Sequence, residues 1–246
     1  MYQFFVEPSQ IQGTEIIIEG NDVNHIKNVL RMKIGEELSI SNGIDNKEYR
    51  CGIEKIEEDR VICCLRFVKE DGMELPSKVF LFQGLPKADK MELIIQKAVE
   101  LGVYEIIPVA AKRCVVKLDE KKEKNKISRW QGIAQAAAKQ SKRRIIPQVK
   151  EILTMREAIE YASKLDVRLI PYELAEGMDK TKAIMENLLP EQSIAVFIGP
   201  EGGFEDNEIK EAIDEGIEPI TMGKRILRTE TAGFTILAWI MYHLEA

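Results

Sequence analysis

The stretch VFIGPEGGFED, residues 196–206, runs from an apolar strand into a loop that holds three glycines, one proline and an acidic residue. A short apolar run without polar alternation is typical of a strand that helices cover on both faces. The loop fits neither common phosphate-binding pattern. Glu201 stands where G-x-G-x-x-G needs its second glycine, and no Lys-Ser or Lys-Thr pair follows as the P-loop requires. The stretch therefore indicates an α/β domain whose loop holds a ligand through backbone groups.

The alternation of strand, loop and helix continues on both sides of this stretch. Three helices are expected to begin with a capping box, formed by Asp89 and Glu92, by Ser128 and Gln131, and by Thr154 and Glu157. The expected strands are 78–85, 105–110, 167–172, 193–199 and 217–223, and the expected helices are 89–102, 128–143, 154–165, 205–216 and 231–244. This order predicts a mostly parallel sheet over residues 75–246.

Residues 1–70 have a different pattern, with short β-branched runs broken by glycines and by the pair Asn42-Gly43. Such spacing predicts a small antiparallel barrel or meander. One helix is expected after residue 20, with Val23, Ile26, Val29 and Leu30 on its apolar face. The polar segment 69–78 contains glycine and proline, and we place the linker there.

Composition limits the classes of function. The chain of 246 residues is 45% hydrophobic and 31% charged, as expected for a globular protein. No apolar run is long enough to span a membrane, and the first residues lack the features of a secretory signal, so we expect a cytoplasmic protein. The four cysteines show no C-x-x-C spacing and the two histidines stand apart, which argues against a metal site.

The charge is unevenly distributed. Residues 112–150 contain 13 basic and 3 acidic residues, although the net charge of the whole chain is −6. A segregated basic segment suits a polyanion such as RNA, but it is also compatible with a solvated lysine-rich face. The part KQSKRRIIP, residues 139–147, mixes arginine with glutamine and serine, a composition that suits phosphate contacts.

Three loops follow neighbouring strands, and the carboxyl ends of parallel strands form the usual ligand site of an open sheet. They begin near residues 171, 199 and 222. In the third, Arg225 and Arg228 flank Ile226 and Leu227. This apolar pair can wall a pocket for a flat uncharged ring, or it can pack into the core. The glycine loop can likewise be a ligand site or only a tight turn into the next helix.

These residues carry a resemblance to a known family. IGPEGGF followed by MGKRILRTETA resembles the RsmE family, ribosomal RNA uridine N3-methyltransferases of the SPOUT superfamily. HIKNVLRMKIGEEL, IIQKAVELGV and AAAKQSKRRIIPQV are similar to further blocks of that family and occur in the same order. The resemblance therefore extends over nearly the whole chain.

The resemblance implies a PUA-like β-barrel over residues 1–70 and a SPOUT-type domain with a trefoil knot over residues 75–246. It implies S-adenosylmethionine as cofactor, 16S ribosomal RNA or the small subunit as substrate, and a homodimer. The expected cofactor-binding residues are Ile198, Gly199, Pro200, Gly202, Gly203, Met222, Gly223, Ile226, Leu227, Thr231 and Ala232.

Methylation at N3 of uracil requires loss of a proton and stabilisation of the resulting negative charge. We expect Arg228 to stabilise charge, and Glu201 or Glu230 to orient the base. The candidate RNA contacts are Arg31, Arg113, Arg143 and Arg144. Two other functions remain open: an RNA-binding assembly factor without catalysis, and a nucleotide hydrolase, against which the unmatched phosphate patterns argue.

Overall fold

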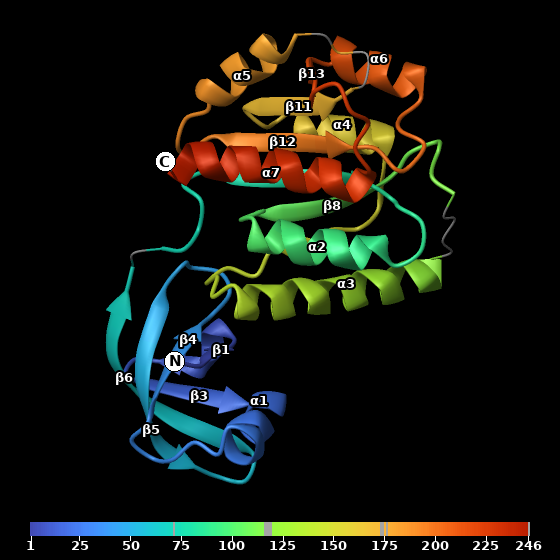
Figure 1. The fold of residues 1–246 in the computed structure, drawn as a ribbon. Coiled ribbons are helices and arrows are strands. Elements are labelled where there is room, and N and C mark those ends of the chain that lie inside the picture. The colour runs from blue at the N-terminus through green and yellow to red at the C-terminus, as the bar shows by residue number, and fades with distance from the viewer. Residues whose placement is uncertain (71, 116–119, 173–174, 176, 246) are drawn as a thin grey trace. The chain divides into compact units, whose positions relative to one another are not determined.

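The structure, a computed structural model, describes residues 1–70, 72–115, 120–172, 175 and 177–245 and separates them into two compact units (Figure 1). The first unit consists of Met1–Glu74 and Ala138–Ile146, and the second of Leu75–Ala137 and Pro147–Ala246. Residues 138–146, which sequence patterns alone assign to the second domain, thus pack with the first.

The first unit is a six-stranded sheet in the order β1-β4-β5-β6-β3-β2, in which β1 pairs with β4 in parallel and the other pairs are antiparallel. Its strands are β1 (Gln3–Phe5), β2 (Ile11–Gln12), β3 (Glu15–Glu19), β4 (Glu37–Ser41), β5 (Glu48–Ile56) and β6 (Arg60–Lys69). Its helical turns are η1 (Pro8–Gln10), α1 (Asn21–Asn24) and η2 (His25–Val29). The sheet encloses a core that includes Phe4, Ile16, Leu38 and Val61.

The expected helix of this unit is present but irregular. It begins after Gly20 as α1 and continues as a π-helical turn, η2, in which the N–H of Leu30 bonds to His25 O at 2.8 Å. A π turn contains an extra residue, so it shifts the following side chains around the axis. Ile26 is buried as predicted, whereas Val29 is exposed, and its place on the apolar face was wrong.

Arg143 and Arg144 are buried in this unit, with 4% and 3% of their surface exposed. The Arg143 guanidinium pairs with Glu74, and Arg144 pairs with Glu48 at 3.0 Å. A buried guanidinium is stable only when paired. The prediction that these two side chains contact RNA is therefore wrong for this structure, because they fasten residues 138–146 to their own unit.

The second unit contains a sheet of parallel strands in the order β10-β8-β7-β12-β11-β13, with β9 also beside β8. Its strands are β7 (Lys78–Gly84), β8 (Glu105–Ala110), β9 (Gln148–Val149), β10 (Leu153–Thr154), β11 (Val167–Pro171), β12 (Ser193–Ile198) and β13 (Glu218–Ile220). Its helices are α2 (Lys90–Glu100), α3 (Glu120–Gln140), α4 (Met155–Ala162), α5 (Met178–Glu186), α6 (Asp206–Asp214) and α7 (Thr229–Glu245), of which α3 ends within the first unit.

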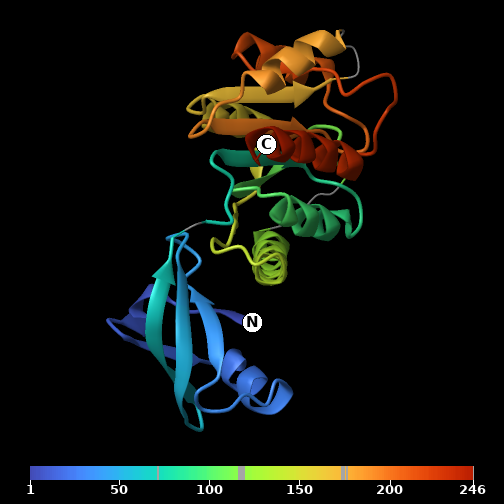
Figure 2. The same ribbon diagram turned by 60° about the vertical axis from the view of Figure 1, so that its left-hand side comes forward.

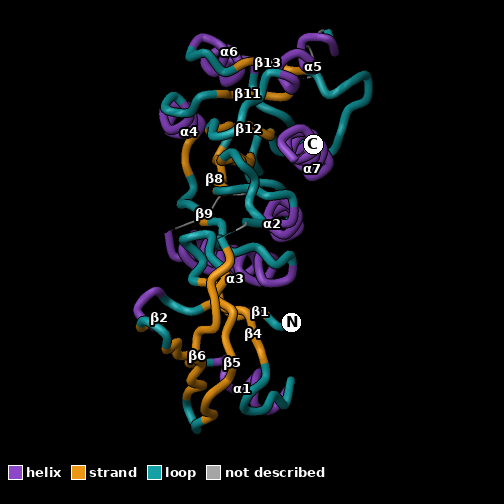
Figure 3. The backbone as a smooth tube through the Cα atoms, turned by 90° about the vertical axis from the view of Figure 1, so that its left-hand side faces the viewer, coloured by secondary structure: helices purple, strands orange, loops and turns teal. Residues whose placement is uncertain are grey.

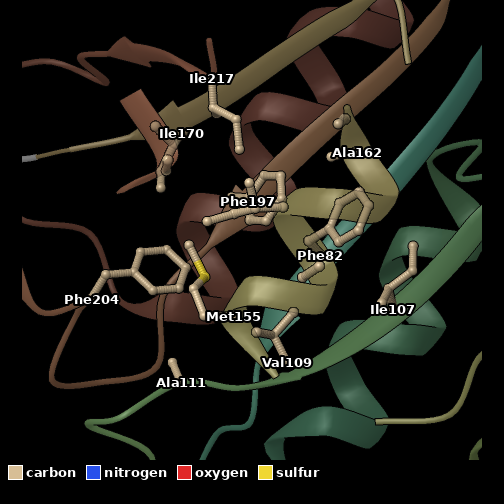
Figure 4. Packing of buried hydrophobic residues seen from close by; sticks show 14 of the residues in the cluster. Phe82, Ile107, Val109, Ala111, Met155, Ala162, Ile170, Phe197, Phe204 and Ile217 are labelled. Carbon is tan, nitrogen blue, oxygen red and sulfur yellow. The ribbon is translucent and has the colours of Figure 1, made fainter. Parts of the chain in front are cut away.

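Helices cover both faces of this sheet, as its apolar strands predict. Figure 3 shows α4 and α6 on one face and α2 and α7 on the other, and α2 and α7 lie side by side in Figures 1 and 2. Under α4 and α6, Phe82 and Phe197 stack with ring centroids 4.4 Å apart (Figure 4). No helix within the described ranges is long and apolar enough to cross a membrane.

The capping predictions had mixed outcomes. Thr154 and Glu157 form the predicted box at the start of α4. Ser128 does not start a helix, because α3 already begins at Glu120. The side chain of Asp89 makes no capping bond, and Glu92 instead pairs with Arg129 at 2.8 Å. The Asp89 box therefore fails because a tertiary contact with Arg129 uses the Glu92 carboxylate that would have completed it.

Candidate functional site

A cavity of about 660 Å³ lies in the second unit, at the carboxyl ends of β11, β12 and β13. All three loops that the sequence places at this edge contribute to it. Its lining consists of Lys90, Arg113, Pro171, Tyr172, Ile198, Gly199, Pro200, Glu201, Gly202, Gly203, Phe204, Asp206, Ile209, Thr221, Met222, Gly223, Lys224, Arg225, Ile226, Leu227, Arg228, Thr229 and Ala232.

Strand pairing brings the glycine loop across the end of β7. Ile198 of β12 pairs with Gln83, so the next residue on each strand stands at the same edge. A Cβ on Gly84 would lie 2.6 Å from Pro200 Cδ, closer than any side chain allows, so glycine there lets the loop cross. At the far end of the loop, Phe204 is buried in the core. The loop is therefore anchored on both sides of its glycines.

Thr229, the first residue of α7, joins two walls of the cavity. Its hydroxyl donates a hydrogen bond to Gly199 O at 2.6 Å and accepts one from Gln83 Nε2 at 2.9 Å. Thr229 is buried, so these bonds are protected from water. They fix the start of α7 against the glycine loop.

The loop between β13 and α7 has exposed side chains at Lys224, Arg225, Ile226 and Arg228. Ile226 is 88% exposed, so the alternative in which it packs into the core is wrong. Arg225 and Arg228 are also exposed and form no ion pair with any described residue. The loop thus offers the cavity an aliphatic side chain and two unpaired guanidinium groups.

A cluster of charges joins three elements at the cavity wall. Lys90 Nζ, at the start of α2, lies 3.0 Å from Glu201 Oε1 in the glycine loop and 3.4 Å from Glu230 Oε2 in α7. Burial opposes ionisation of Glu201, but the hydrogen bonds from Lys90 and from the backbone N–H of Lys87 outweigh it and lower the pKa of this carboxyl. The Glu201 bond in turn raises the pKa of Lys90. Both shifts favour the charged forms of Glu201 and Lys90 at neutral pH.

Arg113 approaches the glycine loop from the segment after β8. Its Nη1 donates a hydrogen bond to Gly202 O at 3.0 Å. The neighbouring Lys112 N donates to Glu208 Oε1 at 3.0 Å, and Glu208 also caps the start of α6. Arg113, which the sequence suggested as an RNA contact, thus lies at the cavity wall with its side chain exposed.

The structure brings most of the expected site residues together. The lining includes all expected cofactor residues except Thr231, and it includes Arg228 and Glu201. Glu230 is outside the lining but reaches it through Lys90. Arg31 belongs to the first unit, where it is exposed.

Sequence reasoning missed Lys90. The available signal was the end of β7, which lies beside β12 and opens at the same edge of the sheet. Knowledge of the strand order, which the sequence does not give, would have added the loop after residue 84, which leads to Lys90, to the three loops expected at the site.

Two family models match the chain: an RNA methyltransferase domain over residues 73–241 and an RNA methyltransferase PUA domain over residues 18–63. A ribosomal RNA small subunit methyltransferase E from Bacillus subtilis (strain 168) is 36% identical over 251 aligned residues, which span 100% of this chain and 98% of that protein. The chain belongs to the ribosomal RNA small subunit methyltransferase E family. The resemblance found in the sequence is thereby confirmed.

Two solved structures are similar over both units. A ribosomal RNA small subunit methyltransferase E from Neisseria gonorrhoeae, bound to S-adenosylmethionine, aligns with a TM-score of 0.84 and 30% identity, covering 98% of this chain and 97% of that one. A methyltransferase from Legionella pneumophila, also with bound S-adenosylmethionine, aligns with a TM-score of 0.83 and 32% identity over 98% and 96%. The α/β fold with a PUA-like first domain is therefore that of the family.

Proposed function

We propose that this protein methylates N3 of a uridine in 16S ribosomal RNA with S-adenosylmethionine as the methyl donor. The observation that carries the proposal is the single cavity formed by the loops after β11, β12 and β13. It lies in a chain whose relatives are named for methylation of small-subunit ribosomal RNA and whose structural neighbours bind this donor.

The lining fits the donor. The volume of about 660 Å³ lies in the usual range for small-molecule sites. A Cβ on Gly203 or Gly223 would meet no atom within 4 Å, so a ligand can approach the backbone at both positions. Ile226 and Leu227 supply aliphatic surface for an uncharged adenine ring. The donor has no phosphate, which agrees with a glycine loop that lacks the phosphate-binding patterns.

The residues of the chain have distinct roles in this proposal. S-adenosylmethionine supplies the methyl group. The backbone of Gly199–Gly203 and of Met222–Leu227 holds it, together with Ile198 and Ala232, while Thr231 lies in the first turn of α7. Arg228 is exposed and unpaired among the described residues, so its guanidinium is available to stabilise negative charge on the uracil or to anchor a phosphate.

Glu201 is a poor general base, because a carboxyl with a lowered pKa holds a proton weakly. We assign it, with Glu230, to positioning rather than to proton removal.

For the partners, we propose RNA contacts at Arg31 and Arg113, both exposed. We further propose a homodimer that acts in the cytoplasm on the RNA or on the small subunit. The trefoil knot and the domain limits 1–70 and 75–246 stay predictions of the family resemblance.

Mass mapping of modified nucleosides tests the function. Small-subunit RNA from cells that lack this protein is expected to contain unmodified uridine at one site, and the purified protein with S-adenosylmethionine is expected to convert it to 3-methyluridine. Calorimetry with S-adenosylmethionine distinguishes the methyltransferase from the RNA-binding assembly factor, because the assembly factor is expected not to bind this donor. An unchanged nucleoside after add-back, under conditions where the donor binds, would contradict the proposal.

A further inference from the structure

We propose that Lys90 is a catalytic residue of the methyl transfer, a fixed hydrogen-bond donor that faces the uracil and stabilises the carbonyl oxygen on which charge collects when N3 loses its proton. This inference rests on the proposed function and adds to it a group that neither the sequence motifs nor the family resemblance suggested.

The position of Lys90 is defined from two sides. Glu201 reaches it from the glycine loop and Glu230 from the first turn of α7, at 3.0 and 3.4 Å. Lysine has a long flexible side chain, and holding it between two carboxylates removes most of that freedom before substrate binds. A donor fixed in advance costs no reorganisation during the reaction, which makes it effective in catalysis.

Lys90 keeps a hydrogen-bond donor for a substrate. An ammonium group has three N–H donors, and within the described part of the chain its ion-pair partners are these two carboxylates. Its side chain is 32% exposed and lines the cavity. The third N–H can therefore bond to a ligand oxygen without displacing Glu201 or Glu230.

The charges around Lys90 indicate which kind of ligand group its free N–H would bind. The two carboxylates partly neutralise Lys90, so it acts mainly through a directed hydrogen bond. Five cationic side chains line the cavity, against the two acidic ones, Glu201 and Asp206; the cations are Lys90, Arg113, Lys224, Arg225 and Arg228. Such a wall favours an anionic ligand group, which suits deprotonated uracil.

The reaction balances without another reagent. The N3–H bond breaks and its proton passes to solvent. The electron pair on N3 then forms the bond to the methyl carbon, while the carbon–sulfur bond breaks and leaves its electron pair on sulfur. Lys90 and Arg228 differ in this step: Lys90 is held by two carboxylates, whereas Arg228 is exposed and has no ion-pair partner among the described residues.

The test compares the full-length wild type with Lys90→Met and Lys90→Arg on small-subunit RNA that lacks the modification. We expect Lys90→Met to lower kcat about 100-fold, the lower end of the effect of losing one preorganised donor. Its affinity for S-adenosylmethionine by calorimetry is expected to stay within about threefold of wild type, and Lys90→Arg to recover part of the rate. Lys97→Met is the matched control, because Lys97 lies on the same helix and its ion-pair partner within the described residues is Glu100 alone.

Two further readouts distinguish catalysis from a structural cross-link. The defect of Lys90→Met is expected to shrink as pH rises, because uracil then ionises without help. It is also expected to shrink on RNA made with 5-fluorouridine, whose N3 proton is more acidic. A kcat within about threefold of wild type, or a defect that neither pH nor fluorination changes, overturns the role of Lys90. A wild type that binds the donor but methylates no uridine overturns the proposed function together with it.

Discussion

Two pairs of arginines in this protein look alike in sequence and differ in the structure. Arg143 and Arg144 are buried and paired with Glu74 and Glu48. Arg225 and Arg228 are exposed at the cavity and pair with no described residue. Both pairs stand beside isoleucine in a basic segment.

The difference shows that a basic motif becomes a binding surface only where carboxylates do not already satisfy it. A buried guanidinium loses its hydration and needs a nearby carboxylate in return. An exposed one keeps its hydration and can exchange it for a phosphate or for a developing negative charge. The first pair therefore serves the stability of its unit, and the second is available for chemistry.

The largest expected effect is on stability, from Arg143→Met. The substitution leaves the Glu74 carboxylate, 10% exposed, without its cationic partner. Breaking such a buried pair is expected to cost about 3 kcal/mol, measured as the free energy of unfolding in urea. Arg60→Met is the control in the same unit, because the Arg60–Glu57 pair lies at the surface and its loss is expected to leave the free energy of unfolding nearly unchanged. An equal loss in the free energy of unfolding for the two variants would contradict the stabilising role of the buried arginine pair.

Arg228→Ala is expected to change activity and leave stability unaltered. Turnover should fall at least about tenfold, the scale of one lost charge-assisted interaction, while donor affinity and the melting temperature remain near wild type. Arg156→Ala, at an exposed position of α4, is the control for loss of a surface arginine. Unchanged turnover of Arg228→Ala would remove this side chain from the mechanism. The exposed arginine pair would then have no demonstrated role in activity.

The smallest expected effect concerns pH and the Glu201–Lys90 contact. The folded protein holds the pKa of Glu201 below its ordinary value of 4.5, so the stabilisation is complete above that value and is lost as pH falls through the folded pKa. Thermal melting of the wild type should show the free energy of unfolding fall by at most about 1 kcal/mol between neutral pH and about pH 3.5 because of this contact. Glu201→Gln has no carboxylate at this position and should lack that part of the loss. A loss of the same size in both proteins would assign it to other carboxylates.

Some local features followed directly from the sequence. The Thr154–Glu157 box and the strands around residues 78–84, 105–110 and 193–198 are set by neighbouring residues and by short periodic patterns, and they were predicted correctly. Helix α5 was not predicted, because its short segment has no strong apolar face and no capping residue at Gly177. The start of α3 was placed eight residues late because a lysine-rich stretch carries little periodic signal.

The sequence by itself determined that this is an α/β protein with a glycine loop at the end of a buried strand, because strand ends, glycines and helix caps are local. Only the tertiary structure decided which side chains share the site. It inserts β12 between β7 and β11, and so brings the backbone of Lys87 against Glu201, 114 positions away. It also pairs Arg144 with Glu48, 96 positions apart. Contacts over such separations depend on how the strands are ordered and on what burial leaves unpaired, and no local pattern contains that information.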